Sequence, residues 1–270
     1  NNTGNIIGAS PNYLKMHSYG EYIFDHAWAN AFENAGGKYY PKLLSAIPFT
    51  PATGPRILID PKNPDNNKIF ELIIKMFEVI VQNNNLSSAH INFITDNLNK
   101  KLNNEKWIKR KGLQFHWHNK DYNSFEDFLS KLKSSKRKAI RKERRTILNN
   151  NLIIQKVTGN ELNSEMWDSF YNFYLNTIDK KWGGAYLTKS FFNLINKTMK
   201  NKILLIIARQ NNKIVAGALN FIGKDTLYGR NWGSIVDIPF LHFELCYYQA
   251  IEYAIDNNIK TVEAGSQGHH

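Results

Sequence analysis

The sequence predicts a mixed fold, classed as α/β (α+β), in which mainly antiparallel sheets are flanked by helices. In the last third of the 270-residue chain, apolar segments at residues 203–208, 214–222 and 226–232 are separated by short polar turns. Strands joined by such turns are typical of an antiparallel meander. A helical segment at 240–256 and a strand at 261–264 follow. Hydrophobic residues form 42% of the chain and charged residues 21%, which indicates a packed globular protein.

A similar order of elements comes earlier in the chain and predicts a fold built from two related halves. Residues 5–14 and 213–222 align in character, and each stretch precedes a strand, a helix and another strand. Repetition in a fixed order is the signature of an internal repeat. The other elements expected are strands at 6–14, 57–60, 90–94, 113–117 and 152–157, and helices at 25–32, 66–83, 167–176 and 188–199.

A long helix is expected between the halves. Ser124 is a good N-cap, and Asp127 stands where a capping box places its second residue. The chain starts without a methionine and stops just after a strand. We therefore expect the first half to be incomplete at its N-terminus, and the second half can be incomplete at its C-terminus. The predicted parts are a first half at 1–123, a basic connecting helix at 124–150 and a second half at 151–270.

Positive charge is concentrated on this helix. The chain has a net charge of +12, and residues 131–145 supply a net +8 of it, with nine basic residues against one acidic residue. Such a field is expected to attract a polyanion, for example a phosphate-bearing substrate, RNA or a lipid surface. Arginine in particular can bind phosphate through two hydrogen bonds at once. The alternative is a solvated helix face. The candidate phosphate-binding residues are Arg137, Lys138, Arg141 and Arg145.

Several classes of protein are disfavoured. The single cysteine, Cys246, excludes an intrachain disulfide and a cysteine-based zinc site, and its apolar neighbours favour core packing. The apolar run at 69–81 is interrupted by charges, so no transmembrane segment is expected. His116 and His118 share one face of a strand, but a third metal ligand is not evident, so we expect them to contact substrate or to have a structural role rather than to bind a metal. These features predict a cytoplasmic protein without a metal site.

Seven stretches resemble one known family, and the resemblance as a whole runs from about residue 5 to the end. They are HSYGEYIFDHAWANAFENAGGKYYPKL (17–43), PFTPATGPR (48–56), FHWHN (115–119), KRKAIRKERR (136–145), ALNFIGKDTLYGRNWG (218–233), FLHFELCYYQAIEYAI (240–255) and VEAGSQG (262–268). They are similar to the FemAB-like family of predicted N-acyltransferases, of the peptidogalycan biosynthesis or recognition type, in the GNAT superfamily. The resemblance implies a tandem GNAT-like acyltransferase fold and transfer of an activated acyl or aminoacyl group to an amine. Relatives in the wider group use aminoacyl-tRNA as donor and a nucleotide- or lipid-linked cell-wall precursor as acceptor.

The sequence departs from the CoA-dependent members of this superfamily at the turn before the main helix. Those enzymes have a glycine-rich turn there, whose backbone N–H groups bind pyrophosphate. Residues 235–242 contain no glycine and include Asp237, and residues 60–65 of the first half are no better suited. An acyl-CoA donor is therefore less favoured than aminoacyl-tRNA, and no cofactor is assigned.

Four polar side chains of the second half are the candidate catalytic residues. Amide formation needs a base for the amine and a donor for the leaving group. His242 is expected to act as the base, and Tyr228 to protonate the leaving group. The alternative is that the polar residues at the start of the main helix cap it and satisfy buried polar groups. The candidates are His242, Glu244, Glu263 and Tyr228.

Further residues are expected to bind substrate in a groove between the halves. Asp25 is expected to be the N-cap of its helix first and a pocket residue second. The loop at 48–55 can present Arg56 to a ligand, or it can be a rigid connector. The expected substrate-binding residues, besides the histidine pair at 116 and 118, are Arg230, Trp232, Gln267, Tyr22, Asp25, His26 and Trp28.

Three functions are compatible with these features. The first is a FemAB-like N-acyltransferase. The second is a non-catalytic module that binds RNA or a phosphorylated glycan on a GNAT-like scaffold, because a fold does not fix a function. The third is a CoA-dependent GNAT acetyltransferase with an unusual donor loop.

Overall fold

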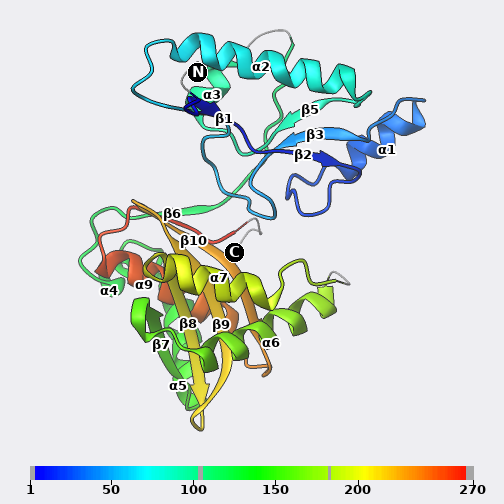
Figure 1. Ribbon diagram of the computed structural model, residues 1–270. Coiled ribbons are helices and arrows are strands. Elements are labelled where there is room, and N and C mark those ends of the chain that lie inside the picture. Colours follow the sequence, from blue (N-terminus) through cyan, green and yellow to red (C-terminus); the bar gives the residue numbers. More distant parts are fainter. Residues whose placement is uncertain (1–3, 103–105, 182–183, 266–270) are drawn as a thin grey trace. The chain divides into compact units, whose positions relative to one another are not determined.

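The chain folds into two compact units, Asn1–Leu113 and Gln114–His270, shown in Figure 1. The computed structural model describes residues 4–102, 106–181 and 184–265. The division differs from the expected end of the first half at residue 123. The reason is that β6 (His116–His118) pairs with β11 (Thr261–Glu263), so residues 114–123 belong to the second unit.

The second unit is built on a six-stranded sheet in the order β6-β11-β10-β9-β8-β7. Neighbouring strands are antiparallel except β10 and β11, which are parallel. The meander predicted at residues 203–232 is therefore correct, and the predicted fold class is confirmed. The remaining strands of this sheet are β7 (Ile153–Thr158), β8 (Ile203–Gln210), β9 (Lys213–Ile222) and β10 (Thr226–Ser234).

Helices cover both faces of this sheet because apolar side chains of the central strands alternate between two cores (Figure 1). Leu205 and Ile207 of β8 contact the core that contains Phe170 and Phe192, from α6 and α7. Leu204 and Ile206 contact the core formed with α4, α5 and α9. The helices of this unit are α4 (Phe125–Ser130), α5 (Ser134–Asn149), α6 (Ser164–Lys181), α7 (Lys189–Met199), α8 (Leu241–Phe243) and α9 (Gln249–Asp256), with short 3-10 turns η1 (Gly159–Glu161) and η2 (Lys200–Lys202).

The helix expected at 240–256 contains a π-helical turn, η3 (Glu244–Tyr248), between α8 and α9. Phe240, just before α8, has a left-handed backbone with φ of 68°. Single π turns within helices are frequent at functional sites, and bulky residues rarely adopt left-handed backbone. The start of this helix therefore combines two backbone features that are frequent at functional sites.

The single helix expected at 124–150 is in fact two helices, α4 and α5. Lys133 has an extended backbone, with ψ of 143°, and interrupts the helical path. The expected cap is confirmed, because the Ser124 hydroxyl accepts a hydrogen bond from the Asp127 N–H. The Asp127 carboxylate in turn accepts from the backbone N–H of Asn123.

The first unit has a three-stranded sheet in the order β2-β3-β5 and a two-stranded sheet formed by β1 and β4. β2 and β3 are antiparallel, and β3 and β5 are parallel. Its strands are β1 (Gly8–Ala9), β2 (Asn12–Lys15), β3 (Lys42–Ser45), β4 (Leu58–Ile59) and β5 (Ala89–Ile91), and its helices are α1 (His26–Asn34), α2 (Asn66–Asn83) and α3 (Asp96–Lys101).

The strand expected at 6–14 is divided between these two sheets. The chain leaves β1 and enters β2 through Ser10 and Pro11, and proline has no N–H for a continuous ladder. β9, with which residues 5–14 align in sequence, is a single unbroken strand. The internal repeat therefore stays a prediction.

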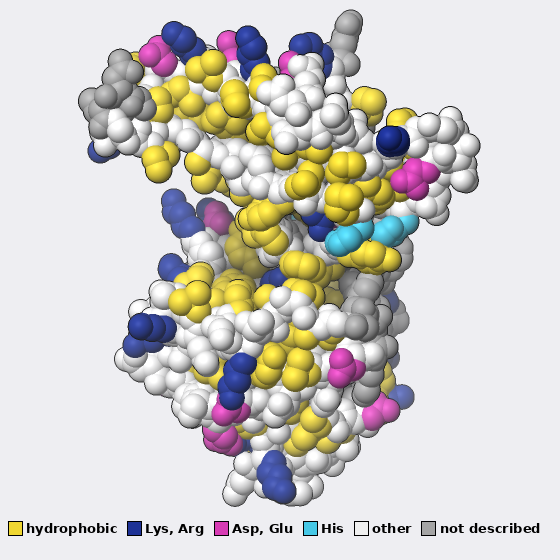
Figure 2. Space-filling view, turned by 45° about the vertical axis from the view of Figure 1, so that its right-hand side comes forward, with side chains coloured by type: hydrophobic (Ala, Val, Ile, Leu, Met, Phe, Trp, Pro, Cys, Tyr) yellow, Lys and Arg dark blue, Asp and Glu magenta, His cyan; other side chains and the backbone are white. Residues whose placement is uncertain are grey.

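Among the described residues, no helix has both the length and the apolar character needed to cross a bilayer. Figure 2 shows hydrophobic side chains at the surface of both units, among scattered charged ones.

Candidate functional site

Three polar side chains form a row across the sheet of the second unit. Glu263 of β11 is opposite Tyr228 of β10 on one side and His116 of β6 on the other. Residues directly opposite each other lie on the same face of a sheet. Tyr228 is also opposite Phe221, which packs against the core formed with α6 and α7. The row His116–Glu263–Tyr228 therefore faces the α6–α7 side.

Glu263 has an unusual environment for a carboxylate. The residue is only 8% exposed. Its Oε1 lies 3.9 Å from His116 Nδ1, and its Oε2 is buried without a hydrogen-bond partner in the part of the chain that the structure describes. Burial disfavours the charged form and raises the pKa of Glu263 to about 7. The side chain can therefore exchange a proton near neutral pH.

The neighbours of Glu263 are neutral under the same conditions. Burial, together with the nearby His118, lowers the pKa of His116. Burial and the charge of Glu263 raise the pKa of Tyr228. His116 thus supplies no positive charge that would keep Glu263 ionised, and Tyr228 keeps its proton. The site combines a base that titrates near neutrality with a phenol that can donate a hydrogen bond.

His118 lies next to this row. Its ring centroid is 6.3 Å from that of His116, and its Nδ1 is 3.4 Å from the Thr261 hydroxyl. In the described ranges no group of three or more histidine, cysteine, aspartate or glutamate side chains could hold a metal ion. Since side chains two apart on a strand share a face, His118 lies on the same face of β6 as His116 and extends the polar row.

Arg230 lies at a bulge of β10, between Gly229 and Asn231, where the pairing with β9 shifts register. Its guanidinium carbon is 5.9 Å from the centre of the Tyr186 ring, and the Asn231 amide donates to the Tyr186 hydroxyl at 3.5 Å. A bulge of this kind turns a side chain to a new direction. Arg230 and Asn231 are thus held by the segment that connects α6 and α7.

His242 is placed on the other face of the sheet. Its ring lies 5.2 Å from that of Trp232, which is opposite Ala218 and packs with the α4–α5–α9 core. The rings of Phe243 and Tyr247 complete an aromatic group around His242, each at 5.7 Å. The structure therefore places His242 and Trp232 together but separates them from Tyr228 and Glu263.

Glu244 is held in a buried ion pair. Its Oε1 accepts from Nε and Nη2 of Arg144 at 3.2 and 3.1 Å and from the Gln249 amide at 2.7 Å. Arg144 also contacts Glu252. These contacts connect α5 to the π-helical turn, so the geometry gives Glu244 a structural role beside the one expected from the sequence.

The basic residues of α5 differ in their contacts. Arg137 donates to the carbonyl oxygens of Ser130 and Leu132 at 3.4 and 3.5 Å, and Arg141 pairs with Glu126 at 2.6 Å. Lys138 and Arg145 are exposed, and no ion pair joins either of them to an acidic side chain of the described residues. These two remain accessible to a ligand with phosphate groups. Gln267 lies outside the described residues.

The first unit contains a buried polar network that sequence reasoning did not find. Its centre is Lys42, whose side chain is fully buried. Lys42 Nζ lies 3.0 Å from Glu21 Oε2 and from Asp25 Oδ2, and it donates to the Ser18 hydroxyl at 2.7 Å. Asn92 links Glu21 to Arg56, because its amide donates to Glu21 and its carbonyl oxygen accepts from Arg56 Nε.

This network corrects two expectations. Asp25 precedes α1 but makes no capping hydrogen bond, because its carboxylate is bound by Lys42 and by the Tyr39 hydroxyl. Burial acts to raise the pKa of Asp25, but hydrogen bonds from Ser18, Lys42 and Tyr39 outweigh it and hold the pKa at about 2. Arg56 is fully buried and is not presented to a ligand. It donates to the carbonyl oxygens of Ala52 and Pro55, so the loop is a rigid connector.

The other expected residues of the first unit lie at its surface. The ring of His26 is 5.7 Å from that of Tyr19. Trp28 is 63% exposed, and the Arg110 guanidinium carbon lies 5.7 Å from its ring. Tyr22, next to the buried Glu21, has a left-handed backbone with φ of 56°.

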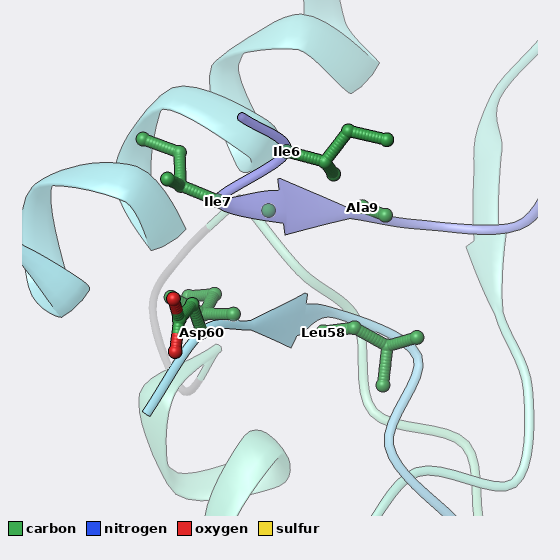
Figure 3. A pocket seen from close by; sticks show the side chains of 7 residues that line it. Ile6, Ile7, Ala9, Leu58 and Asp60 are labelled. Atoms are coloured by element: carbon green, nitrogen blue, oxygen red, sulfur yellow. The ribbon is translucent and has the colours of Figure 1, made fainter. Parts of the chain in front are cut away.

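A pocket of about 250 Å³ lies beside β1 and β4 of the first unit (Figure 3). Its lining is apolar apart from Asp60, whose carboxylate accepts a hydrogen bond from the Lys62 N–H. Its lining therefore contains neither a phenol nor an imidazole, in contrast to the polar row of the second unit.

Comparisons with known proteins show the family through a family model and the fold through solved structures. The model of the FemAB-like family, described as "Peptidogalycan biosysnthesis/recognition", matches residues 1–270. A search of curated proteins found no match to the sequence.

Two solved structures are similar in fold. The C-terminal domain (DUF2156) of a protein described as a lysylphosphatidylglycerol synthetase, from Agrobacterium fabrum, has a TM-score of 0.58 and 12% identity over 85% of this chain and 65% of its own. L-PGS from Bacillus licheniformis has a TM-score of 0.52 and 9% identity over 82% of this chain and 61% of its own. The chain thus spans less than two thirds of the length of either neighbour. By its match along the whole sequence, the chain belongs to the FemAB-like family.

Proposed function

We propose that the protein transfers an aminoacyl group from the ester of a charged tRNA to an amine acceptor, with Glu263 as the general base. The observation that carries the proposal is the buried Glu263 carboxylate, which has a pKa of about 7 and a neighbouring phenol. A base works best when its pKa lies near the working pH. His242, expected to be the base, lies on the other face of the sheet and is not given this role.

The row of polar residues supports one simple reaction. Glu263 accepts one proton from the acceptor ammonium and releases it to solvent, and the neutral amine then attacks the ester carbonyl. As the new C–N bond forms and the C–O bond to the ribose breaks, the ionised Glu263 takes the second proton from the nitrogen and passes it to the leaving ribose oxygen. Tyr228, whose raised pKa keeps it protonated, can donate a hydrogen bond to the oxygen that gains charge.

The choice of tRNA as the aminoacyl donor rests on the exposed positive charge of α5 and on the turn before the main helix. Residues 235–242 lack the glycines that hold the pyrophosphate of CoA. Lys138 and Arg145 of α5 offer exposed charges to a phosphate backbone. Both features favour tRNA over acyl-CoA, and the family description favours a cell-wall precursor as the source of the amine.

A transfer assay tests this function. The protein is incubated with tRNA charged with radiolabelled amino acids and with a panel of amines that includes nucleotide- and lipid-linked peptide precursors. We expect label in an amide product that survives the mild alkali that hydrolyses esters. Transfer from acetyl-CoA, together with thermal stabilisation by acetyl-CoA and none by charged tRNA, would assign a different donor. Binding of tRNA without transfer to any acceptor would favour a non-catalytic binding module.

Charge reversal on α5 tests the contact with tRNA. The variant Lys138→Glu/Arg145→Glu is expected to bind tRNA more weakly, and each lost phosphate contact should reduce the slope of log K against log salt by about 0.9. Lys213→Glu/Lys224→Glu is the matched control, because it makes the same change in net charge at two exposed lysines of the same unit that lie outside α5, at the start of β9 and in the turn after it. Filter binding at several salt concentrations measures the slope. An equal effect of the control would mean that only the net charge matters.

A further inference from the structure

The first unit has an exposed aromatic surface that the proposed reaction does not use. We define it by His17, Tyr19, Phe24, His26 and Trp28, all of which are exposed. Three of the rings lie next to one another. The centre of the Tyr19 ring is 5.1 Å from that of His17 and 5.7 Å from that of His26. Figure 2 shows that hydrophobic side chains reach the surface of this unit. Exposed aromatic side chains that touch each other are unusual on a protein without a ligand for them.

The backbone under this surface is fixed from inside. Ser18 and Asp25, which alternate with the exposed residues, are buried and bound to Lys42. From outside, Lys15 donates to the Tyr19 carbonyl oxygen at 3.1 Å. Arg110 donates to the carbonyl oxygens of residues 23 and 24 at 2.8 and 3.2 Å. The backbone that carries the rings is therefore held in place before a ligand arrives, which lowers the entropy cost of binding.

Backbone strain accompanies this arrangement. Tyr22 and Phe24 have left-handed backbones, with φ of 56° and 52°, which bulky residues adopt only when the surrounding structure imposes it. The Lys42 network holds both ends of this segment, because Glu21 directly precedes Tyr22, Asp25 directly follows Phe24, and both carboxylates are bound to Lys42. Buried ion pairs add little stability by themselves. The network is better explained as the support that presents the rings.

The charges around the surface are positive. The guanidinium of Arg110 lies over the Trp28 ring, and Lys109 and Lys111 beside it are exposed. In residues 4–45 the exposed carboxylate is that of Glu33, because Glu21 and Asp25 are buried. Rings combined with cations are what binds single-stranded nucleic acid, whose bases stack while its phosphates are neutralised. A saccharide also stacks on aromatic rings, but the neighbouring carboxylates of Glu21 and Asp25, which could accept hydrogen bonds from its hydroxyl groups, are bound to Lys42.

We propose that this aromatic surface binds single-stranded RNA by stacking bases on Tyr19, His26 and Trp28. The proposal concerns the first unit and does not require transfer activity in the second. The single-stranded acceptor end of a tRNA is one such ligand, and in that case the surface serves the transferase proposed above.

Paired substitutions separate stacking from general hydrophobic contact. Tyr19→Leu and Trp28→Leu keep apolar area but remove the aromatic ring, whereas Tyr19→Phe and Trp28→Phe keep a ring. We expect each leucine variant to bind a fluorescent single-stranded oligoribonucleotide about 5- to 150-fold more weakly, and each phenylalanine variant to stay close to the original protein. All these side chains are exposed, so folding should be preserved, and circular dichroism checks it.

The control variant is Tyr13→Leu, which changes an exposed tyrosine on β2 outside this surface. Fluorescence anisotropy with the full chain compares single-stranded RNA, a duplex of the same sequence and a chitin oligosaccharide. Preference for the single strand, lost in both leucine variants, supports the proposal. It is overturned by equal binding of the duplex, by binding of the saccharide instead, by absence of RNA binding, or by RNA binding that depends on α5 but not on Tyr19 and Trp28.

Discussion

Replacement of Glu263 by glutamine is expected to lower kcat for aminoacyl transfer by about 10²–10⁴-fold, the usual contribution of a general base. Glutamine has nearly the same shape but cannot accept the proton of the amine. In the original protein the rate should rise with pH through about 7, because Glu263 becomes ionised there. That rising limb should be missing from the residual activity of Glu263→Gln. A variant that keeps the same limb would show that another group is the base.

The same substitution should change stability in a pH-dependent way. The pKa of Glu263 is raised from 4.5 to about 7 in the folded state, so the folded protein binds the proton more tightly than the unfolded chain. Stability is therefore lost as pH rises from 4.5 to 7, at a total cost of about 3 kcal/mol above that range. Glu263→Gln removes this cost.

Thermal unfolding at pH 4 and pH 8 measures the difference. The variant should gain stability at pH 8 relative to the original protein and change little at pH 4. Glu161→Gln, at an exposed glutamate of η1, is the matched control and should be neutral at both pH values. If Glu263→Gln had the same melting temperature as the original protein at pH 8, ionisation of Glu263 would not reduce the stability of the fold.

Replacement of Lys42 by methionine is expected to destabilise the first unit by about 3–5 kcal/mol at pH 7. Methionine has a similar length but no charge, so the buried carboxylates of Glu21 and Asp25 would lose their shared cation. The effect should become smaller at low pH, where protonation neutralises the carboxylates. Urea unfolding, followed by a probe in the first unit, measures the change.

Two further variants serve as controls for the effect of Lys42→Met. Lys38→Met changes an exposed lysine of the same unit and should be close to neutral. Adding Glu21→Gln and Asp25→Asn to Lys42→Met should restore part of the stability, because no unpaired charge then remains buried. If Lys42→Met is as stable as Lys38→Met, the lysine does not compensate the two carboxylates in solution.

Elements with strong local patterns were predicted well from the sequence. The helix expected at 66–83 matches α2, because its apolar residues recur at helical spacing over eighteen residues. The strands of the meander match β8, β9 and β10 within a few residues. The break between α4 and α5 and the division of 6–14 into β1 and β2 were missed. Both depend on backbone changes at only one or two residues, which periodicity does not detect.

The candidate site was predicted only in part. Tyr228, Glu263 and His116 were each candidates, but their alignment requires β6 to pair with β11, and Glu263 lies 147 residues after His116 in the sequence. His242 and Glu263 were grouped because both lie near strand and helix ends, yet the sheet separates them. Lysine is rarely buried unless an opposite charge is paired with it. Lys42 was missed because its two carboxylate partners lie 17 and 21 residues before it, and no local pattern in the sequence connects them to it.

The pairing of β6 with β11 has a consequence for the chemistry of the second unit. Without β6, β11 would become an edge strand, and water would reach Glu263 from that side. A hydrated glutamate has the acidity of an ordinary carboxylic acid and is a poor proton acceptor for an ammonium group. A three-residue strand at the start of the unit thus tunes the proton affinity of a side chain encoded near the other end.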